Sequence, residues 1–310
     1  METNEFIENE VQEYRLQTEK RENETKEQFF KYLLLGYSVS RFRKWLSKEW
    51  DDSDIEKMKV ATSKLEELVD KTSGIDNLPK KTEEFFETIP YKRFRELKKD
   101  FSKECLSYYE KRQEIASKVP NKAEYLKDFV DKYDKYMANI PYFKDGKVYS
   151  WHTLSDYTSM IYNTNLTRTG WNRSFADAEN SGTDLLYLPA HPFACPHCLE
   201  WQGRYYQAKG KGKYPPIQEA LDGGLGHPNC KHVPVPAFDD KKRQNDLYNS
   251  SEWEEKYKLQ QKVIAIERQK EKLRTDLSIY KNLGDQTSID LIIAKIKKLN
   301  EKEREIKNFL

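Results

Sequence analysis

The segment from His191 to His232, HPFACPHCLEWQGRYYQAKGKGKYPPIQEALDGGLGHPNCKH, decides how the rest of the chain is interpreted. It contains three of the four cysteines and four of the five histidines of the sequence. Thiolate and imidazole are the protein groups that bind zinc best, and a Cys-x-x-Cys pair presents two thiolates to one ion. Only Cys105 and His152 lie outside the segment. The clustering therefore predicts a zinc site.

Five residues are the main candidates for zinc ligands. Cys195, Cys198 and Cys230 supply three of the four donors that a closed structural site needs. His232 follows Cys230 by two residues, so on a strand both side chains would point to the same face. His227 precedes Cys230 by three residues and can return to the site through a Pro-Asn turn. We predict a Cys3His site completed by one of these two histidines.

Two further histidines are less well placed in the sequence. His191 is a possible extra ligand, because it lies four residues before the first thiol. His197 sits between the paired cysteines, and we expect its side chain to point outward.

Other chemistries fit the segment less well. Cys195-Pro-His-Cys198 is a sequence typical of disulfide oxidoreductases, but no βαβ pattern frames it and the following glycine limits any helix to about one turn. The signatures of zinc deaminases, metalloproteases and P-loops are missing from the sequence. A zinc-stapled HNH-type nuclease is the best enzymatic alternative. Three thiolates and one histidine would close the zinc sphere, so we expect a structural role and no catalysis.

Composition indicates long, solvated helices. Of the 310 residues, 34% are charged and 37% hydrophobic, and the formal net charge is only +2. Dense charge of mixed sign is typical of exposed helices and does not suggest a basic nucleic-acid binder. The sequence shows no signal peptide and no apolar run of about 20 residues that could span a membrane. We expect a soluble protein that is made in a reducing cytoplasm.

The chain divides into three predicted domains: residues 1–149, 150–238 and 239–310. The first is predicted to be helical, with Asn121 capping one of its helices. The second begins with a helix after a turn at Asp145–Gly146, and we interpret Arg168, Trp171 and Arg173 as ordinary surface residues near the end of that helix. Residues 189–236 hold eight of the twelve prolines and six of the twelve glycines, which predicts turns between short elements.

Within this second domain we expect strands at 184–188, 204–207 and 232–236, and a short helical turn at 216–221. The prolines at 234 and 236 make the last strand an edge strand. So small a fold needs a staple, which a zinc ion would supply. Residues 239–310 are predicted to form a helical hairpin, or a coiled coil with another chain, broken at Gly284. The predicted fold class is mainly α with a small zinc-stapled α+β domain between long amphipathic helices.

These residues resemble the phage minor capsid protein 2 family of tailed bacteriophages. Its recurring pattern is a His, a Cys-x-x-Cys pair, Trp-Gln-Gly, a Tyr-Pro step and a glycine-rich approach to His-Pro-Asn-Cys-Arg-His. The matching positions are His191, Cys195, Cys198, Trp201, Gln202, Gly203, Tyr214, Pro215, Gly223, Gly224, His227, Pro228, Asn229, Cys230 and His232. Lys231 stands where the family usually has arginine. The resemblance covers about residues 150–275.

The resemblance implies a low-copy protein of the phage head that is made in the host cytoplasm and acts in head assembly near the portal. Its expected partners are the portal protein, the major capsid protein or both, with a position close to packaged DNA. Neither a membrane nor a small-molecule substrate is expected. The alternative from another functional class is a zinc-supported nuclease or toxin-like effector carried in the head.

Overall fold

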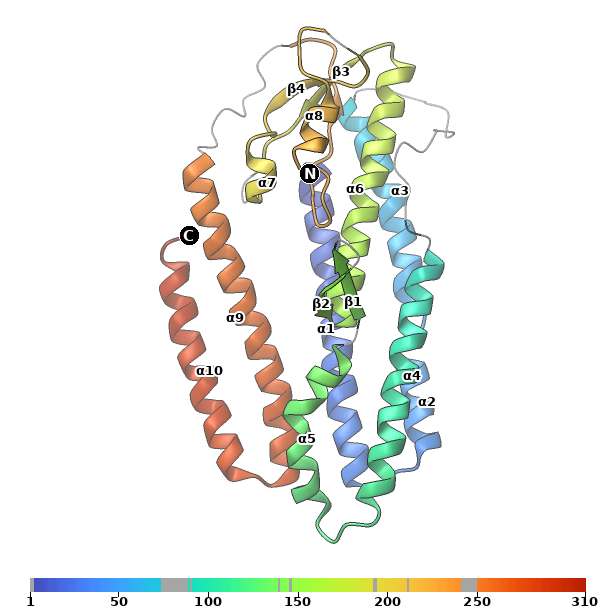
Figure 1. Ribbon diagram of the computed structural model, residues 1–310, viewed down its shortest axis with the longest axis vertical. Helices are drawn as coiled ribbons and strands as arrows, with labels where there is room; N and C mark the ends of the chain where they lie inside the picture. Colours follow the sequence, from blue (N-terminus) through green and yellow to red (C-terminus); the bar gives the residue numbers. More distant parts are fainter. Residues whose placement is uncertain are drawn as a thin grey trace. The chain divides into compact units, whose positions relative to one another are not determined.

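The protein is described here by a computed structural model (Figure 1) that covers residues 3–73, 89, 91–138, 140–144, 147–191, 194–210, 212–240 and 250–310. Most of the residues in these ranges lie in helices and the sheets are small and antiparallel, so the prediction of a mainly helical fold is confirmed. Among these residues, no helix is long and apolar enough to cross a membrane.

The chain forms two compact units, and each unit combines several separate segments. Unit 1 comprises residues 1–14, 54–90 and 159–260, and unit 2 comprises residues 15–53, 91–158 and 261–310. The division into domains 1–149, 150–238 and 239–310 stays a prediction, because a spatial grouping of segments does not test which of them folds independently.

Unit 2 is a set of helices packed around an aromatic core. It contains α2 (Val39–Glu49), α4 (Tyr91–Ala116) and α5 (Lys122–Met137), together with most of α1 (Thr3–Leu34). Phe29 lies at the centre of the core. Its ring packs against five others, whose centroids lie 5.0–5.9 Å away: Phe30, Phe42, Tyr108, Tyr109 and Tyr133. The Asn121 side chain accepts a hydrogen bond from the Glu124 amide, which confirms the predicted cap of α5.

The C-terminal part of unit 2 is a helical hairpin. α9 (Ser250–Leu283) ends just before Gly284, whose φ of 70° reverses the chain, and α10 (Gln286–Lys307) follows. Glu303 of α10 accepts a hydrogen bond from Lys270 of α9, and Lys307, further along α10, donates to the earlier Glu267 of α9, so the two helices run antiparallel. The predicted hairpin is therefore present, whereas a coiled coil with another chain stays a prediction.

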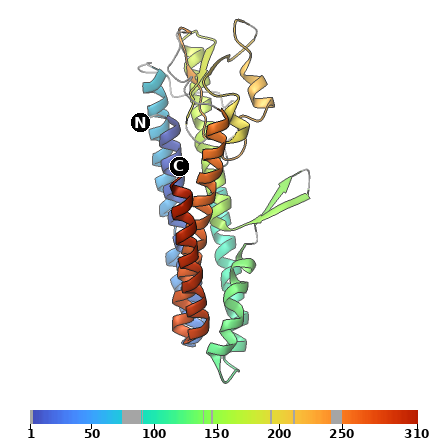
Figure 2. The ribbon, with the colours of Figure 1, turned by 90° about the vertical axis from the view of Figure 1, so that its left-hand side faces the viewer.

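A β-hairpin in unit 2 joins α5 to α6. Strand β1 (Ile140–Lys144) pairs with β2 (Lys147–His152), and Figure 2 shows the pair standing away from α4 and α5. The sequence predicted only a turn at Asp145–Gly146, which lies outside the described residues. Trp151 on β2 is 60% exposed, an unusual position for so large an apolar side chain.

Unit 1 carries the small sheet and the cysteine-rich segment. Helices α3 (Ser53–Ser73) and α6 (Leu154–Asn180) contribute most of their length to it. Its sheet has the order β4-β3-β5, with β3 (Leu185–Leu188) between β4 (Arg204–Gln207) and β5 (Val235–Pro236). The three predicted strands are confirmed, although β5 is shorter than expected. The short helices α7 (Pro196–Leu199) and α8 (Ile217–Asp222) lie between the strands in sequence.

We predict that Lys26 is essential to the stability of unit 2. Its side chain is 3% exposed, and the ammonium group donates hydrogen bonds to Asp276 at 2.6 Å and to Asp134 at 3.0 Å. Lys26→Met should lower the free energy of unfolding by about 3–5 kcal/mol, because the buried Asp276 carboxylate loses its counter-ion. Lys118→Met removes a solvent-exposed pair with Glu114 in the same unit, and should cost far less stability. Equal losses in urea denaturation would contradict this prediction.

The pH dependence of stability should report on Glu22. Burial raises the pKa of this carboxyl group to about 7, against the effect of hydrogen bonds from the Ser155 hydroxyl at 2.5 Å and amide at 3.2 Å. As pH rises from about 4.5 to 7, the unfolded chain loses this proton first, so stability should fall. The side chain keeps some solvent contact, so we expect a loss of about 2 kcal/mol.

Glu22→Gln keeps an acceptor for Ser155 but cannot titrate. Urea denaturation at pH 4.5 and 7.5 should therefore show a smaller loss of stability with pH in this variant than in the wild type. The same loss in both proteins would assign the pH dependence to other groups.

Candidate metal centre

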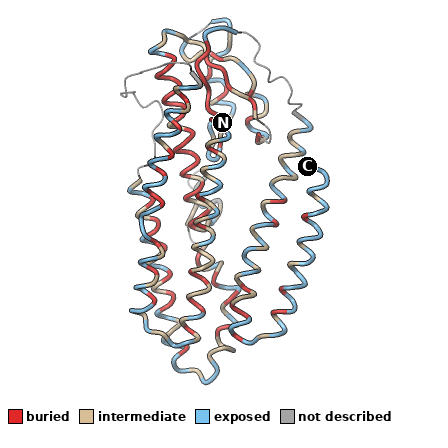
Figure 3. The backbone as a smooth tube through the Cα atoms, turned by 180° about the vertical axis from the view of Figure 1, so that it is seen from behind, coloured by how far each residue is buried: buried red, intermediate tan, exposed pale blue. Residues whose placement is uncertain are grey.

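Helix α6 is the support on which the centre is built. Residues 161–167 and 170–178 of this helix are buried, which is seen as nearly continuous red in Figure 3. A helix buried on most of its faces would normally be apolar throughout, yet α6 carries many buried polar side chains. Such groups must find hydrogen-bond partners, because an unpaired buried polar group is costly.

The partners lie on the extended segment that follows Cys230. The carbonyl of Cys230 accepts from Asn163 Nδ2 at 2.8 Å and from Thr167 Oγ1 at 2.6 Å. The next two bonds each skip one residue: Trp171 Nε1 donates to the His232 carbonyl at 2.7 Å, and Ser174 Oγ donates to the Pro234 carbonyl at 2.5 Å. We call these four bonds the α6 row.

The spacing of the α6 row follows from the two backbone geometries. Positions 163, 167, 171 and 174 lie on one face of a helix, because they are separated by steps of four, four and three. In an extended chain every second carbonyl points to the same side, which selects residues 230, 232 and 234. At Gly170, a Cβ atom would lie only 2.8 Å from Val233 Cγ2, so glycine permits the close approach of helix and segment.

A tight turn presents His227 and Cys230. The Cys230 amide donates to the His227 carbonyl at 2.8 Å, and Asn229 has a φ of 72°. Proline at the second position and asparagine with positive φ at the third are the residues that a type II turn requires. His-Pro-Asn-Cys is therefore a turn sequence that places two metal-binding residues three positions apart.

The paired cysteines lie at the start of α7. Cys195 precedes the helix, Pro196 occupies its first turn, and the Cys198 amide donates to the Cys195 carbonyl at 2.9 Å. This single helical turn brings the Sγ atoms of Cys195 and Cys198 to 3.5 Å from each other. The expectation of a helix of about one turn after the first thiol is confirmed.

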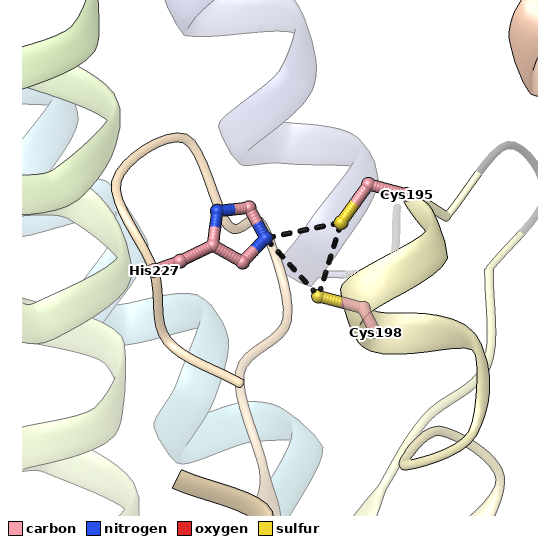
Figure 4. A group of neighbouring side chains, drawn as sticks. All are labelled: Cys195, Cys198 and His227. Atoms are coloured by element: carbon pink, nitrogen blue, oxygen red, sulfur yellow. Dashed lines mark hydrogen bonds between the residues drawn. The ribbon is translucent and has the colours of Figure 1, made fainter. Parts of the chain in front are cut away.

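The first group of donors consists of Cys195, Cys198 and His227 (Figure 4). His227 Nε2 lies 3.0 Å from Cys195 Sγ and 3.4 Å from Cys198 Sγ. With Zn–S bonds of about 2.3 Å and Zn–N bonds of about 2.0 Å, a tetrahedral ion would separate its ligand atoms by about 3.5–3.8 Å. The observed spacings of 3.0–3.5 Å lie at or somewhat below these values.

A second group consists of Cys198, Cys230 and His232, all three buried. Cys230 Sγ lies 3.7 Å from Cys198 Sγ and 3.9 Å from His232 Nδ1. The structure thus brings together the three cysteines and both candidate histidines, in two groups that share Cys198. Their sulfur and imidazole donors suit zinc.

Hydrogen bonds fix which nitrogen of each histidine is free. His227 Nδ1 donates to the Pro228 carbonyl at 2.7 Å, since a carbonyl can only accept, and Nε2 is left facing the sulfurs. Gln202 Oε1 accepts from the His191 amide at 3.1 Å and from His232 Nε2 at 2.9 Å, which leaves His232 Nδ1 facing Cys230. Orientation of this kind is typical of histidines that bind metal.

Hydrogen bonds within the cluster shift the pKa values of its cysteines and of His227. Hydrogen bonding with Cys198, together with that to His227, lowers the pKa of the Cys195 thiol to about 4. The hydrogen bond with Cys195 raises the pKa of His227 to about 9. The pKa of Cys230 is also well below its ordinary value, first because of Cys198 and then because of His232. Thiolates are the form in which cysteine binds a metal ion.

The other predicted residues have supporting positions. The ring of His191 packs against that of His232 at 4.2 Å between centroids, and His191 belongs to neither donor group. His197 is exposed, as expected. Trp201 covers Gly223, where a Cβ atom would lie 2.0 Å from the indole ring, and the Gly203 amide donates to the Leu188 carbonyl at 2.7 Å.

The interpretation of Arg173 as a surface residue is wrong, because its side chain is buried and pairs with Asp70 and Asp177. That of Trp171 is wrong as well. Its side chain is only 2% exposed and belongs to the α6 row. Asn163 and Thr167 were not singled out from the sequence, although polar residues at helical spacing in a segment with apolar neighbours are a usable signal. The first helix also contributes to this unit, because Asn4 Oδ1 accepts from the Val233 amide at 3.2 Å and Glu8 pairs with Lys231 at 2.6 Å.

We predict that zinc binding by His227 and Cys230 depends on the left-handed backbone conformation of Asn229. Asn229→Val should cost about 1–2 kcal/mol, because a branched side chain opposes positive φ, and should weaken zinc binding about tenfold. Asn229→Gly adopts the same conformation freely and should bind zinc as the wild type does. Competition with a chromogenic chelator measures both affinities. Equal zinc affinities of the valine and glycine variants would contradict this prediction.

Comparison with known proteins identifies the family of the chain. No curated protein and no solved structure is significantly similar to the chain. The family model described as phage minor capsid protein 2 matches residues 129–310, which is more than half of the chain and extends beyond the part on which the resemblance rested. The match includes the whole of α6, every donor of both groups and the α9–α10 hairpin. The chain therefore belongs to the phage minor capsid protein 2 family.

Proposed function

We propose that this protein is a structural component of the phage head that acts in head assembly near the portal, and that zinc holds its cysteine-rich segment in place. Membership of a minor capsid family supports a place in the virion and contacts with other phage structural proteins. The observation that carries the zinc part of the proposal is the convergence of three cysteines and two oriented histidines in two groups that share Cys198.

The burial of the donors supports a stabilising role for the metal ion. Cys198, Cys230 and His232 are each 1–2% exposed. An ion held there would tie α7 to the turn at 227–230 and to the segment on the α6 row. Structural zinc ions in small domains contribute on the order of 10 kcal/mol to folding, so the ion would be the staple that this small sheet needs. Catalysis is not part of the proposal.

The proposed partners are the portal protein and the major capsid protein. Unit 2 offers surfaces of a kind that partners bind, because it exposes large apolar side chains at Val148 and Trp151 of the β-hairpin and at Leu291 and Ile293 of α10. In the proposed arrangement the metal-stabilised unit provides a rigid body, and such exposed positions meet neighbouring subunits in the head.

The zinc part is tested on the full-length chain purified without chelator. We expect at least one zinc per chain by elemental analysis, with loss of zinc and of thermal stability in Cys198→Ser. Cys105→Ser is the matched control, since Cys105 is a buried thiol outside the cluster, and it should keep its zinc. A metal-free wild-type protein with Cys195 and Cys198 in a disulfide would contradict the zinc site.

The head-assembly part is tested by co-expression with the portal and major capsid proteins of the same phage. We expect the wild-type chain and Cys105→Ser to co-purify with at least one of them, and Cys198→Ser to do so poorly. Metal-dependent cleavage of DNA or RNA that is lost in His227→Ala would contradict the structural role and favour a nuclease or toxin-like effector.

A further inference from the structure

The donors of the metal centre are too many, and too widely spread, for one tetrahedral ion. Five ligand residues converge, whereas a structural zinc ion takes four. They do not form one group of four or five. They form two groups of three, Cys195, Cys198 and His227 on one side and Cys198, Cys230 and His232 on the other.

Each group is complete in itself as a three-donor metal site. Ligand atoms within a group lie no more than 4.8 Å from one another, and among the described residues no fourth donor joins either group within that limit. A single Cys3His site would need Cys230 to join the first group, or Cys195 to join the second. Cys198 is the one residue that both groups contain, and its Sγ lies 3.5 Å from that of Cys195 and 3.7 Å from that of Cys230.

Hydrogen bonds orient the two histidines in the same way, each toward a different donor group. The Pro228 carbonyl holds His227 so that Nε2 faces the first group, and Gln202 holds His232 so that Nδ1 faces the second. Each imidazole has one nitrogen satisfied and presents the other to sulfur. For His232 this nitrogen lies 3.9 Å from Cys230 Sγ, inside the buried second group, where an ion held by Cys230 would also be in reach.

We propose that the centre binds two zinc ions bridged by the Cys198 thiolate, an inference that rests on the zinc site proposed above. One ion is held by Cys195, Cys198 and His227, and the other by Cys198, Cys230 and His232. Two tetrahedral ions need eight positions. One shared and four unshared protein donors fill six of them, and a water molecule completes each ion. Sharing of thiolates is established chemistry, since a Zn2Cys6 module also serves two ions with fewer than eight donors.

Zinc binding exchanges protons of the ligand side chains for metal ions. The protons that the thiols and the His227 imidazole hold in the free protein pass to solvent as the sulfur–zinc and nitrogen–zinc bonds form, and each zinc ion gives up the water molecules that the protein donors replace. No oxidation or reduction takes place, and the bridge requires no reactant besides Zn2+.

The test is the number of zinc ions per full-length chain, measured by native mass spectrometry and elemental analysis after loading with Zn2+ under reducing conditions. We expect two ions in the wild type and in the Cys105→Ser control. Cys195→Ser and Cys230→Ser each remove a donor from one group and should keep one ion, whereas Cys198→Ser should keep none. One ion in the wild type would overturn the bridged pair and leave the proposed zinc site standing. No ion would overturn both.

A second measurement needs no variant and so does not depend on a mutant that folds. In the wild-type chain loaded with 113Cd2+, the β-protons of Cys198 should correlate with two cadmium signals, whereas those of Cys195 and Cys230 should each correlate with one. Correlation of all three cysteines with a single cadmium signal would overturn the bridge.

Discussion

The metal centre depends on the α6 row, the hydrogen bonds by which one face of α6 holds the carbonyls of Cys230, His232 and Pro234. The segment after Cys230 contains two prolines and can form only a two-residue strand, so sheet pairing cannot satisfy most of its backbone. Its carbonyls are buried and must be paired. Side chains of α6 take over that role, and the segment is thereby fixed in position along the helix.

Once this segment is fixed, the positions of the donors follow from short-range geometry. The type II turn at 227–230 sets His227 relative to Cys230, and alternation along the extended chain sets His232. One turn of α7 sets Cys195 relative to Cys198. Gln202 ties the two parts together, because its Oε1 accepts from residues on both sides, His191 and His232. A metal centre can therefore form in a region with few regular strands.

The sequence predicted those features that depend on local chemistry. Proline and asparagine at 228 and 229 determine a turn by their own backbone preferences, and the strands at 185–188 and 204–207 follow from short apolar runs between breakers. Prediction from the sequence failed where the burial or the role of a residue depends on a partner far away in the chain. Trp171 is buried because the His232 carbonyl, 61 positions later in the chain, lies beside it and accepts its indole hydrogen bond. Nothing in the sequence around Trp171 indicates that partner. The β-hairpin at 140–152 and the role of Asn4 were missed for the same reason, since pairing across the chain leaves little trace in local composition.

The most direct test of this account compares amide hydrogen exchange in the zinc-loaded chain and in the same chain after chelation. The α6 row holds the backbone carbonyls of the segment and the metal would hold its side chains, so removal of zinc should speed exchange in residues 195–203 and 226–230. Exchange in α6 itself should change much less, because its bonds to the segment do not involve the ion. Identical exchange in both states would contradict the claim that a metal ion completes this fold.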